Sequence, residues 1–243
     1  MKRFGIILAI TIGVIITLFI IGRFTGAFGW YKSPTPANEP TLKMGGSFFF
    51  SNLKKPSRGN FIVFKNGYTD SMLVRGSGAD YVSNNYVKRL CGMAGDVLEM
   101  KDGVLFVNGK NFDRDYNLKA YYATTVAEMQ KTGLDLDSMG NAPTGDFRQM
   151  SKDTILVNLD DKLAAELKKI AIINRYFMIE TEGMSRSFEW LAYRGSFTVD
   201  NWGPITVPAD HYFVLGDNRQ NALDSRYFGF VPKKSWLGTV LWK

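Results

Sequence analysis

The strongest constraint on the fold of this chain is an uncharged apolar run near its N-terminus. Residues 4–22 read FGIILAITIGVIITLFIIG, without one Asp, Glu, Lys or Arg. At about 1.5 Å per residue, a helix of this length is about long enough to cross a hydrocarbon core of roughly 30 Å. We therefore expect residues 4–22 to form a transmembrane anchor that follows a short N-terminal segment, residues 1–3.

The alternative for this run is a cleaved signal peptide, since the small residues of Thr25-Gly26-Ala27 resemble a cleavage site. The run is longer than the usual signal-peptide core of about 7 to 15 residues, which favours the anchor. Lys2 and Arg3 precede it, and basic flanks tend to stay in the cytoplasm. We expect a single-pass protein of the cytoplasmic (inner) membrane, with residues 1–3 inside and the long remainder on the outer or periplasmic side.

Composition excludes several classes of function. The only Cys and the only His are Cys91 and His211, whereas a structural zinc site takes about four ligands and a catalytic one about three protein ligands. We expect no metal, no cofactor and no disulfide framework. The 30 basic and 23 acidic residues give a net charge of +7, which suits lipid head groups or nucleic acid. Because of the anchor, we expect membrane lipid as the partner and no nucleic acid.

The residues after the anchor are predicted to form mainly β-strands. Residues 23–36 are expected to be a juxtamembrane connector, with Trp30 and Tyr31 of the type that lies at a membrane interface. Apolar and aromatic clusters between Gly and Pro predict further strands at 47–50, 60–64, 86–90, 205–207, 212–215 and in the terminal run WLGTVLW.

Two tight turns are indicated within this β region. Asp102-Gly103 joins the runs 97–100 and 104–107, and Asn108-Gly109 closes the second run. Both dipeptides favour the positive φ angles of hairpin turns. The pattern therefore predicts antiparallel strands here.

Residues 111–200 interrupt these β signals. Asp160 is placed to cap a helix that runs to about Lys169, and a second short helix is expected at 127–131. Three apolar residues of the first helix lie at helical spacing on one side: Leu163, Leu167 and Ile170. No catalytic motif occurs in this stretch.

The predicted fold class is therefore mainly β, preceded by one transmembrane helix. An antiparallel β-rich catalytic body would comprise residues 37–110 and 201–243. Residues 111–200 would be a mixed α/β insertion, a cap subdomain within that body.

A basic pair lies in an apolar, β-prone context. Lys88 and Arg89 stand in the run YVKRL, and because strand side chains alternate between faces, one of the two must face inward. Burial disfavours a lysine ammonium and lowers its pKa, and a neutral amine can act as a general base. Lys88 is therefore a candidate base, although a lysine taken alone is more often a solvated surface residue.

Two segments resemble motifs of a known family. Residues 88–110, KRLCGMAGDVLEMKDGVLFVNGK, and residues 207–232, VPADHYFVLGDNRQNALDSRYFGFVP, are similar to the lysine-bearing and GDNR-bearing boxes of bacterial type I signal peptidases. The anchor ahead of the boxes and their order agree as well. The resemblance implies a membrane-anchored serine endopeptidase with a Ser/Lys dyad, whose partners are exported preproteins carrying signal peptides.

The resemblance also implies roles for individual residues. Lys88 takes the position of the general base, while the Thr35 hydroxyl and the backbone amide of Ala37 take the oxyanion positions. Regions around 61–64 and 86–88 would form the wall that receives small substrate side chains. Four charged residues take supporting positions in the two boxes: Arg89 with Asp217, and Asp224 with Arg226.

The serine box departs from the family pattern. The segment ANEPTL, residues 37–42, has the family's spacing, but Ala37 stands where the nucleophilic serine is expected. A methyl group cannot form an acyl-enzyme, so we expect this chain to be inactive as written. Ala222 likewise stands where many members have a serine that orients the lysine.

Three explanations of Ala37 are open. It is an engineered Ser-to-Ala change in an otherwise intact site, or the chain is a natural non-catalytic, membrane-tethered relative that binds signal peptides or other partners. The third is that another hydroxyl serves, from Ser33, Thr35 or Thr41. Repressor-type Ser/Lys autoproteases are a further related class, but they carry a DNA-binding helix pair where this chain has an anchor. The sequence leaves the oligomeric state unknown.

Overall fold

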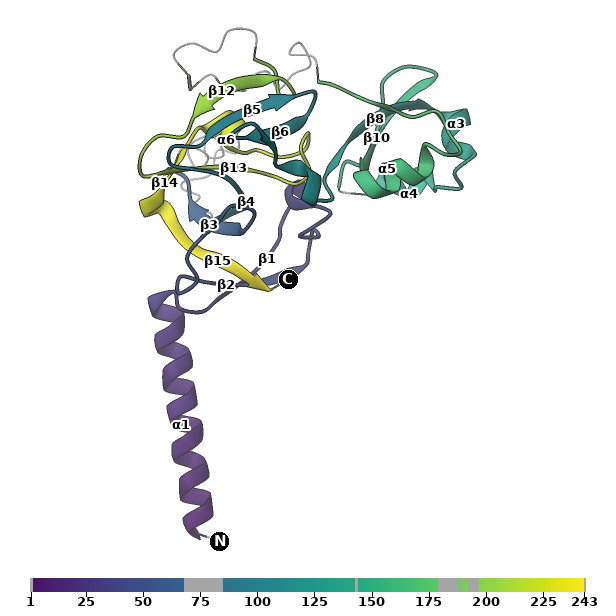
Figure 1. Cartoon of the computed structure of the whole chain (residues 1–243). Coiled ribbons are helices and arrows are strands. Elements are labelled where there is room, and N and C mark those ends of the chain that lie inside the picture. Colours follow the sequence, from purple (N-terminus) through teal and green to yellow (C-terminus); the bar gives the residue numbers. More distant parts are fainter. Residues whose placement is uncertain are drawn as a thin grey trace.

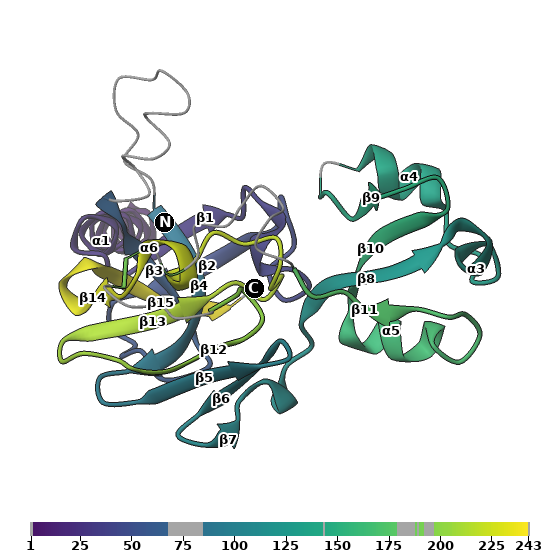
Figure 2. The same cartoon turned by 90° about the horizontal axis from the view of Figure 1, so that it is seen from above.

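A long helix projects from a β-rich body, and a smaller unit with its own sheet lies beside that body (Figures 1 and 2). The computed structural model describes residues 2–67, 85–142, 144–178, 188, 190–191 and 197–242. Within these ranges the strands form three antiparallel sheets, so the fold is mainly β, as predicted.

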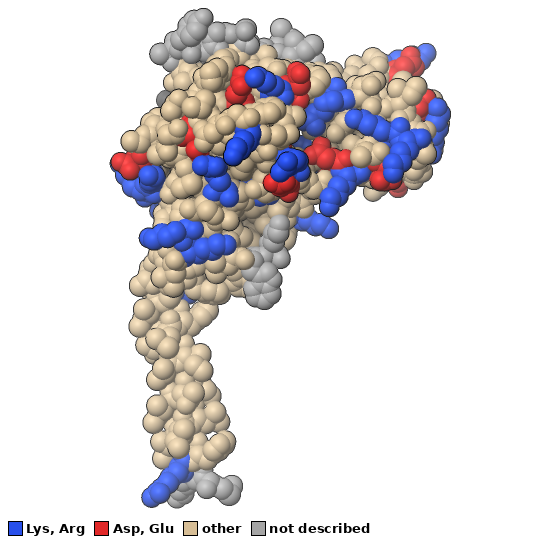
Figure 3. All heavy atoms as spheres, in the orientation of Figure 1, with Lys and Arg blue, Asp and Glu red and all other residues tan. Residues whose placement is uncertain are grey.

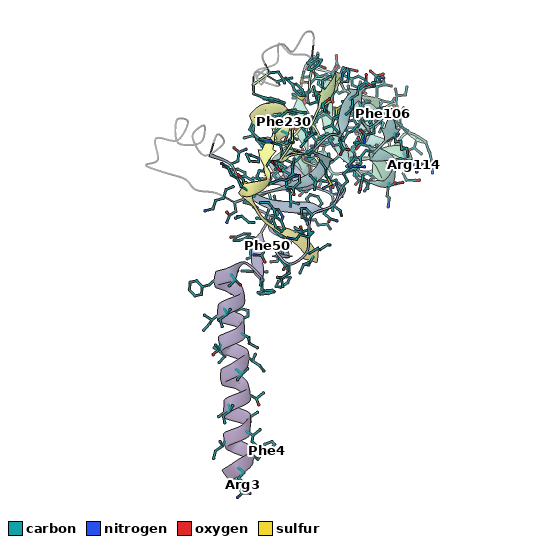
Figure 4. The ribbon with its side chains drawn as sticks, turned by 60° about the vertical axis from the view of Figure 1, so that its left-hand side comes forward. Arg3, Phe4, Phe50, Phe106, Arg114 and Phe230 are labelled. Carbon is teal, nitrogen blue, oxygen red and sulfur yellow. The ribbon has the colours of Figure 1, made fainter. Side chains whose placement is uncertain are left out.

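Helix α1 (Lys2–Thr25) contains the whole apolar run. Its side chains point outward in all directions, with Arg3 and Phe4 at the far end (Figure 4), and its surface is uncharged over most of its length (Figure 3). The Thr11 and Thr17 hydroxyls each donate to a backbone carbonyl one turn earlier, at 2.9 Å, which satisfies these polar groups inside the helix. The helix is therefore long and apolar enough to cross a membrane.

The body is built on a seven-stranded sheet with the order β1-β2-β15-β3-β4-β13-β14. Its strands are β1 (Gly29–Lys32), β2 (Ser47–Ser51), β3 (Phe61–Lys65), β4 (Asn85–Met93), β13 (His211–Leu215), β14 (Val231–Pro232) and β15 (Trp236–Trp242). The predicted strands at 47–50, 60–64, 86–90 and 212–215 and in the terminal run are confirmed. Part of the expected connector is itself a strand, because β1 pairs with β2.

A four-stranded sheet of order β12-β5-β6-β7 packs on the first one. Its strands are β5 (Val97–Lys101), β6 (Val104–Val107), β7 (Lys110–Asn111) and β12 (Trp202–Thr206). The predicted turns are confirmed, since φ is 49° and 73° at Asp102 and Gly103, and 51° and 76° at Asn108 and Gly109. The core between the sheets includes Cys91 and Phe213 from one sheet and Leu98, Leu105 and Trp202 from the other.

The third sheet, β11-β8-β10-β9, belongs to the smaller unit. Its strands are β8 (Lys119–Thr125), β9 (Phe147–Gln149), β10 (Thr154–Asp160) and β11 (Asn174–Arg175), and its helices are α3 (Val126–Gln130), α4 (Leu136–Asn141) and α5 (Asp161–Leu167). One face of the sheet and these helices enclose a separate core. We propose residues 111–200 as the extent of this insertion, of which Asn111 pairs in the body sheet as part of β7 and Phe188 lies in the core of the body.

The predicted cap of α5 is confirmed, but its predicted apolar face is wrong. The Asp160 carboxylate accepts a hydrogen bond from the Leu163 amide at 3.1 Å. Ala164 and Leu167 are buried, whereas Leu163 and Ile170 are exposed. The helix ends at Leu167, so the helical spacing does not continue to Ile170.

Candidate active site

The predicted catalytic positions converge on one cavity of about 610 Å³. Ala37 lies in the short 3-10 helix η1 (Pro36–Asn38), and Lys88 lies in β4. The cavity is lined by parts of four regions: 33–38; 85–88; Thr144, Gly145 and Arg148; and Asn221 with Leu223. Residues that lie far apart in the sequence therefore share one groove.

The turn that carries Ala37 is fixed on both sides. Pro36 occupies the first helical position of η1, where its fixed φ suits a helix start. The Ala37 carbonyl accepts a hydrogen bond from the Asn218 amide at 3.1 Å. The side-chain amide of the next residue, Asn38, donates to the Val87 carbonyl at 2.8 Å. These bonds hold position 37 between β4 and the GDNR loop.

Lys88 is buried, with 6% of its surface exposed. Its Nζ donates to the Val87 carbonyl at 3.3 Å, the same carbonyl that Asn38 binds. Burial is the largest influence on the pKa of Lys88 and lowers it to about 8, while the Asp224 and Asp217 carboxylates act in the opposite direction. About a tenth of the amine is then neutral at pH 7, which an exposed lysine does not reach.

The prediction that one residue of the basic pair faces inward is only half correct, because both are buried. Arg89 lies on the opposite face of β4 from Lys88 and donates to both carboxylate oxygens of Asp217, at 2.7 and 2.6 Å. The guanidinium also lies 4.5 Å from the ring centre of Phe61 and 4.1 Å from that of Tyr116. Paired and stacked in this way, Arg89 can stay charged inside the body.

The second predicted pair is also together, because Arg226 donates to the Asp224 carboxylate at 2.9 and 2.7 Å. Both residues are fully buried. Asp224 caps the short helix α6 (Ser225–Phe228) and accepts a bond from the Gly216 amide at 3.1 Å. The pair thus anchors the loop that begins at Gly216.

Ala37 and Ala222, which stand where the family has serines, both lie against Gly216. A Cβ added at Gly216 would lie 2.4 Å from the Ala222 Cβ and 2.4 Å from the Ala37 carbonyl oxygen. No larger residue fits at 216 without a shift of its neighbours. Position 222 is thereby held next to the turn that carries position 37.

The other hydroxyls near Ala37 differ in their surroundings. Thr35 is exposed and lines the cavity. Ser33 is buried, and its Oγ donates to the Thr35 carbonyl at 3.2 Å. Thr41 accepts a bond from Arg89 at 3.2 Å and belongs to a different pocket. Of the two regions predicted to form the wall for small substrate side chains, only one lines the cavity. Residues 86–88 line it, whereas residues 61–64 are buried in the sheet.

Sequence reasoning missed an ion triad that joins the segment just after Ala37 to the insertion. The Lys119 Nζ, at the start of β8, binds the Glu39 carboxylate at 2.9 Å and the Asp146 carboxylate at 2.6 Å. The backbone of Lys119 also bonds to Asp217 and Arg219 at 2.9 and 2.8 Å. Glu39 occupies a variable position of the serine box, so no local pattern announces this contact.

Sequence reasoning also missed the partner of the GDNR arginine. Arg219 is buried and donates to both oxygens of Asp113 at 2.6 Å. Asp113 lies in the 3-10 helix η2 (Asp113–Asp115), where the chain enters the insertion. Among the residues that the structure describes, no three His, Cys, Asp or Glu side chains are grouped as metal ligands.

Comparison with known proteins places these features in one family. The family described as "Signal peptidase, peptidase S26" matches residues 3–243. Signal peptidase I of Buchnera aphidicola subsp. Baizongia pistaciae (strain Bp) is 26% identical over 94% of this chain and 72% of that protein. Signal peptidase I P of Bacillus subtilis subsp. natto is 29% identical over 92% of this chain and 80% of that protein.

A solved structure of a signal peptidase I from Enterococcus faecalis V583 is also similar. It is 23% identical and covers 77% of this chain and 98% of its own, with a TM-score of 0.34, which is too low to support an argument. The assignment rests instead on the family match, which includes the apolar helix and all three boxes. Since that match extends over nearly the whole sequence, the chain belongs to the signal peptidase family, peptidase S26.

Proposed function

We propose that this chain carries the peptide groove and the general base of signal peptidase I, the serine endopeptidase that removes N-terminal signal peptides from exported preproteins at the membrane surface. One observation carries the proposal. A buried lysine, with its pKa lowered to about 8, lines the same cavity as the position where the nucleophile is expected. Perturbed pKa values of this kind, in a cleft, are typical of catalytic groups.

The mechanism follows for a form with serine at position 37. Neutral Lys88 takes the hydroxyl proton, and the oxygen attacks the scissile carbonyl. The backbone amide of residue 37 and the Thr35 hydroxyl stabilise the oxyanion. Lys88 then gives the proton to the leaving amine, and it activates the water that hydrolyses the acyl-enzyme.

The charged pairs around the lysine support this role. A carboxylate close to an amine stabilises the ammonium and would keep it protonated. Here Asp217 is bound by Arg89, and Asp224 by Arg226, so each carboxylate has a cation beside it. We propose that Arg226, whose charge acts to lower the pKa of Lys88, offsets part of the effect of Asp224, and that both arginines hold the loops in place.

In the chain as written, Ala37 leaves the groove and the base without a nucleophile. Loss of a serine nucleophile lowers turnover on the order of a million-fold in the well-studied case of subtilisin. We propose that this form binds preproteins or signal peptides without cutting them. Whether the alanine is engineered or natural does not alter this expectation.

A second candidate function is that of a natural, non-catalytic peptide-binding relative. The observation that favours it is that Ala37 and Ala222 both lack the expected hydroxyl and lie against the same Gly216. One engineered change accounts for one alanine, whereas a site that has lost its chemistry can lose both. Recruitment of Ser33 or Thr41 is less favoured, since both hydroxyls already have protein partners.

We propose the following topology for the membrane-associated chain. Helix α1 crosses the cytoplasmic membrane once, with residues 1–3 inside and the β body on the outer or periplasmic side, in contact with lipid. The length and apolar surface of α1 support the crossing, and Lys2 and Arg3 support the orientation. On that side, the groove can meet the junction of an exported preprotein.

The test is restoration of the nucleophile. Full-length Ala37→Ser, reconstituted in lipid vesicles, is incubated with a preprotein, and the new N-terminus is read by mass spectrometry. We expect cleavage at the signal junction, and its loss in the double variant Ala37→Ser/Lys88→Ala. If Ala37→Ser binds the preprotein but never cuts it, the non-catalytic function replaces the peptidase.

A further inference from the structure

The insertion supplies one wall of the groove. Thr144, Gly145 and Arg148 line the cavity beside Asn221. The Asn221 side chain donates to the Thr144 carbonyl at 2.9 Å. Since the next residue, Ala222, packs beside the turn of Ala37, this wall meets the groove at its catalytic end.

The strand pattern explains why a charged side chain points this way. In β9 and β10, Phe147 pairs with Val157, and both belong to the insertion core. Arg148 is the next residue of β9, so its side chain leaves from the opposite face. That face is turned toward the catalytic body, because Asn158 of β10 donates to Asn218 of the GDNR loop at 2.9 Å.

The guanidinium of Arg148 is held in place by an aromatic ring. It lies 4.9 Å from the ring centre of Tyr121, whose hydroxyl donates to the Gly145 carbonyl at 2.8 Å. The nearby Asp146 carboxylate is already bound by Lys119 and by Thr144, at 2.6 and 2.8 Å. Arg148 itself is exposed toward the cavity that it lines.

The described lining of the groove is positively charged. Its charged residues are Lys88 and Arg148, and the lining residues of the described ranges include no carboxylate. A guanidinium has a planar set of donors that matches a carboxylate in a bidentate contact. A peptide in this groove would therefore gain from one acidic side chain at the end where the insertion wall lies.

We propose that Arg148 is a specificity-determining residue that selects peptides with an Asp or Glu close to the scissile bond. The inference rests on the proposed function, because it assumes that an extended peptide occupies the groove. It assigns the inserted unit a part in substrate selection, through the wall made by 144–148.

The test measures the equilibrium binding of peptides to the full-length chain in detergent. With Ala37 in place, this chain is expected not to cut the peptides. The probes are fluorescent peptides that span a signal-peptide junction and have alanine at the positions one and three before it. In each probe, a single Asp, or its isostere Asn, replaces one of the other residues within three positions of the junction. At one position or two adjacent ones, we expect the Asp peptide to bind about threefold more tightly than the Asn peptide, which is the effect of a partly exposed ion pair. This preference should vanish in high salt, because salt screens the charges.

Three variants of Arg148 separate charge from packing. Arg148→Glu should reverse the preference, so that a Lys peptide binds better than the Asp peptide. Arg148→Lys should retain it, and Arg148→Met, which keeps apolar contact with Tyr121, should abolish it without changing thermal unfolding. The matched control is Arg114→Glu, which makes the same charge change at a surface arginine whose side chain is 79% exposed. Figure 4 marks its place.

The outcomes distinguish this inference from the function on which it rests. If alanine peptides bind and Ala37→Ser cuts, but Asp and Asn peptides bind equally, the Arg148 inference is overturned and the peptidase stands. The inference is also overturned if Arg148→Glu and Arg114→Glu change the Asp preference equally, because the net charge of the protein would then explain both effects. If no peptide binds and Ala37→Ser does not cut, the proposed function fails, and this inference fails with it.

Discussion

Lys88 is the residue on which the proposed chemistry depends, and its burial gives it the lowered pKa that a general base needs. Removal of the ammonium from water is the main reason why its pKa falls to about 8. From the alternation of β4, the sequence predicted that one residue of the pair Lys88 and Arg89 faces inward, and the choice of Lys88 as the base came by resemblance. Its environment could not be predicted, since Asp217 and Asp224 lie more than a hundred residues away. The pairing of both carboxylates with arginines was predicted only from the family resemblance.

The first prediction concerns the pH dependence of Ala37→Ser. Because the base must be neutral, kcat/KM for a preprotein peptide should rise about tenfold per pH unit below the lysine pKa and level off above about 8. Initial rates between pH 5.5 and 9.5 measure the profile. A rate that is flat across pH 7 to 9 would mean that another group accepts the proton.

A second prediction concerns Ala222, beside the turn that carries Ala37. In the Ala37→Ser background, Ala222→Ser should place a hydroxyl where it can orient the Lys88 amine. We expect kcat to rise about fivefold with KM unchanged, the effect of one hydrogen bond of about 1 kcal/mol. The control is Ala222→Cys, of similar size but a weak hydrogen-bonding group. Equal rates for all three forms would show that position 222 has no orienting role.

At the scale of elements, local signals predicted most of the body. The Asp102-Gly103 and Asn108-Gly109 turns and the apolar strands are local patterns, and their elements formed where expected. The prediction of the apolar face of α5 was wrong. Helical spacing does not show where a helix ends, so Ile170 was counted in a helix that stops at Leu167, and it does not show which side packs on the core, so the exposed Leu163 was counted as buried. The bonds from β8 to Asp217 and Arg219 could not be predicted, since they join the insertion to a distant loop through backbone groups.

The third prediction tests the ion triad of Lys119, Glu39 and Asp146, which joins the segment after Ala37 to the insertion. Lys119→Met leaves the Glu39 and Asp146 carboxylates close together without their cation, in a site where the lysine side chain is only 10% exposed. We expect the free energy of unfolding of the β body to fall by about 2 to 3 kcal/mol, measured by urea denaturation in detergent. The matched control, Lys169→Met, breaks an exposed pair with Glu166 and should cost less than about 0.5 kcal/mol. Similar losses in both variants would contradict a structural role for the triad.

At the scale of the whole molecule, the fold brings four separate segments to one groove. They are 33–38 from the turn of Ala37, 85–88 from β4, Thr144, Gly145 and Arg148 from the insertion, and Asn221 with Leu223 from the loop after Gly216. The sequence predicted the first two by resemblance. It gave no reason to expect the insertion there, because the segment 144–148 carries no catalytic motif and its position follows from contacts such as Asn158 with Asn218.

The measurement that most directly tests the central claim asks whether the Lys88 amine reaches the side chain at position 37. In Ala37→Cys, the lysine should stabilise a thiolate at position 37 and lower the pKa of the new thiol below its usual value near 8.5. The native Cys91 should not interfere, because burial raises the pKa of its thiol to about 12. The rate of alkylation by iodoacetamide, followed against pH, reports the thiolate.

We expect the thiol at position 37 to react at least tenfold faster at pH 7 in Ala37→Cys than in Ala37→Cys/Lys88→Met, with the midpoint of the pH profile shifted upward when the lysine is removed. Superimposable profiles for the two variants would place the amine out of reach of position 37. They would contradict the Ser/Lys dyad from which the proposed function is built.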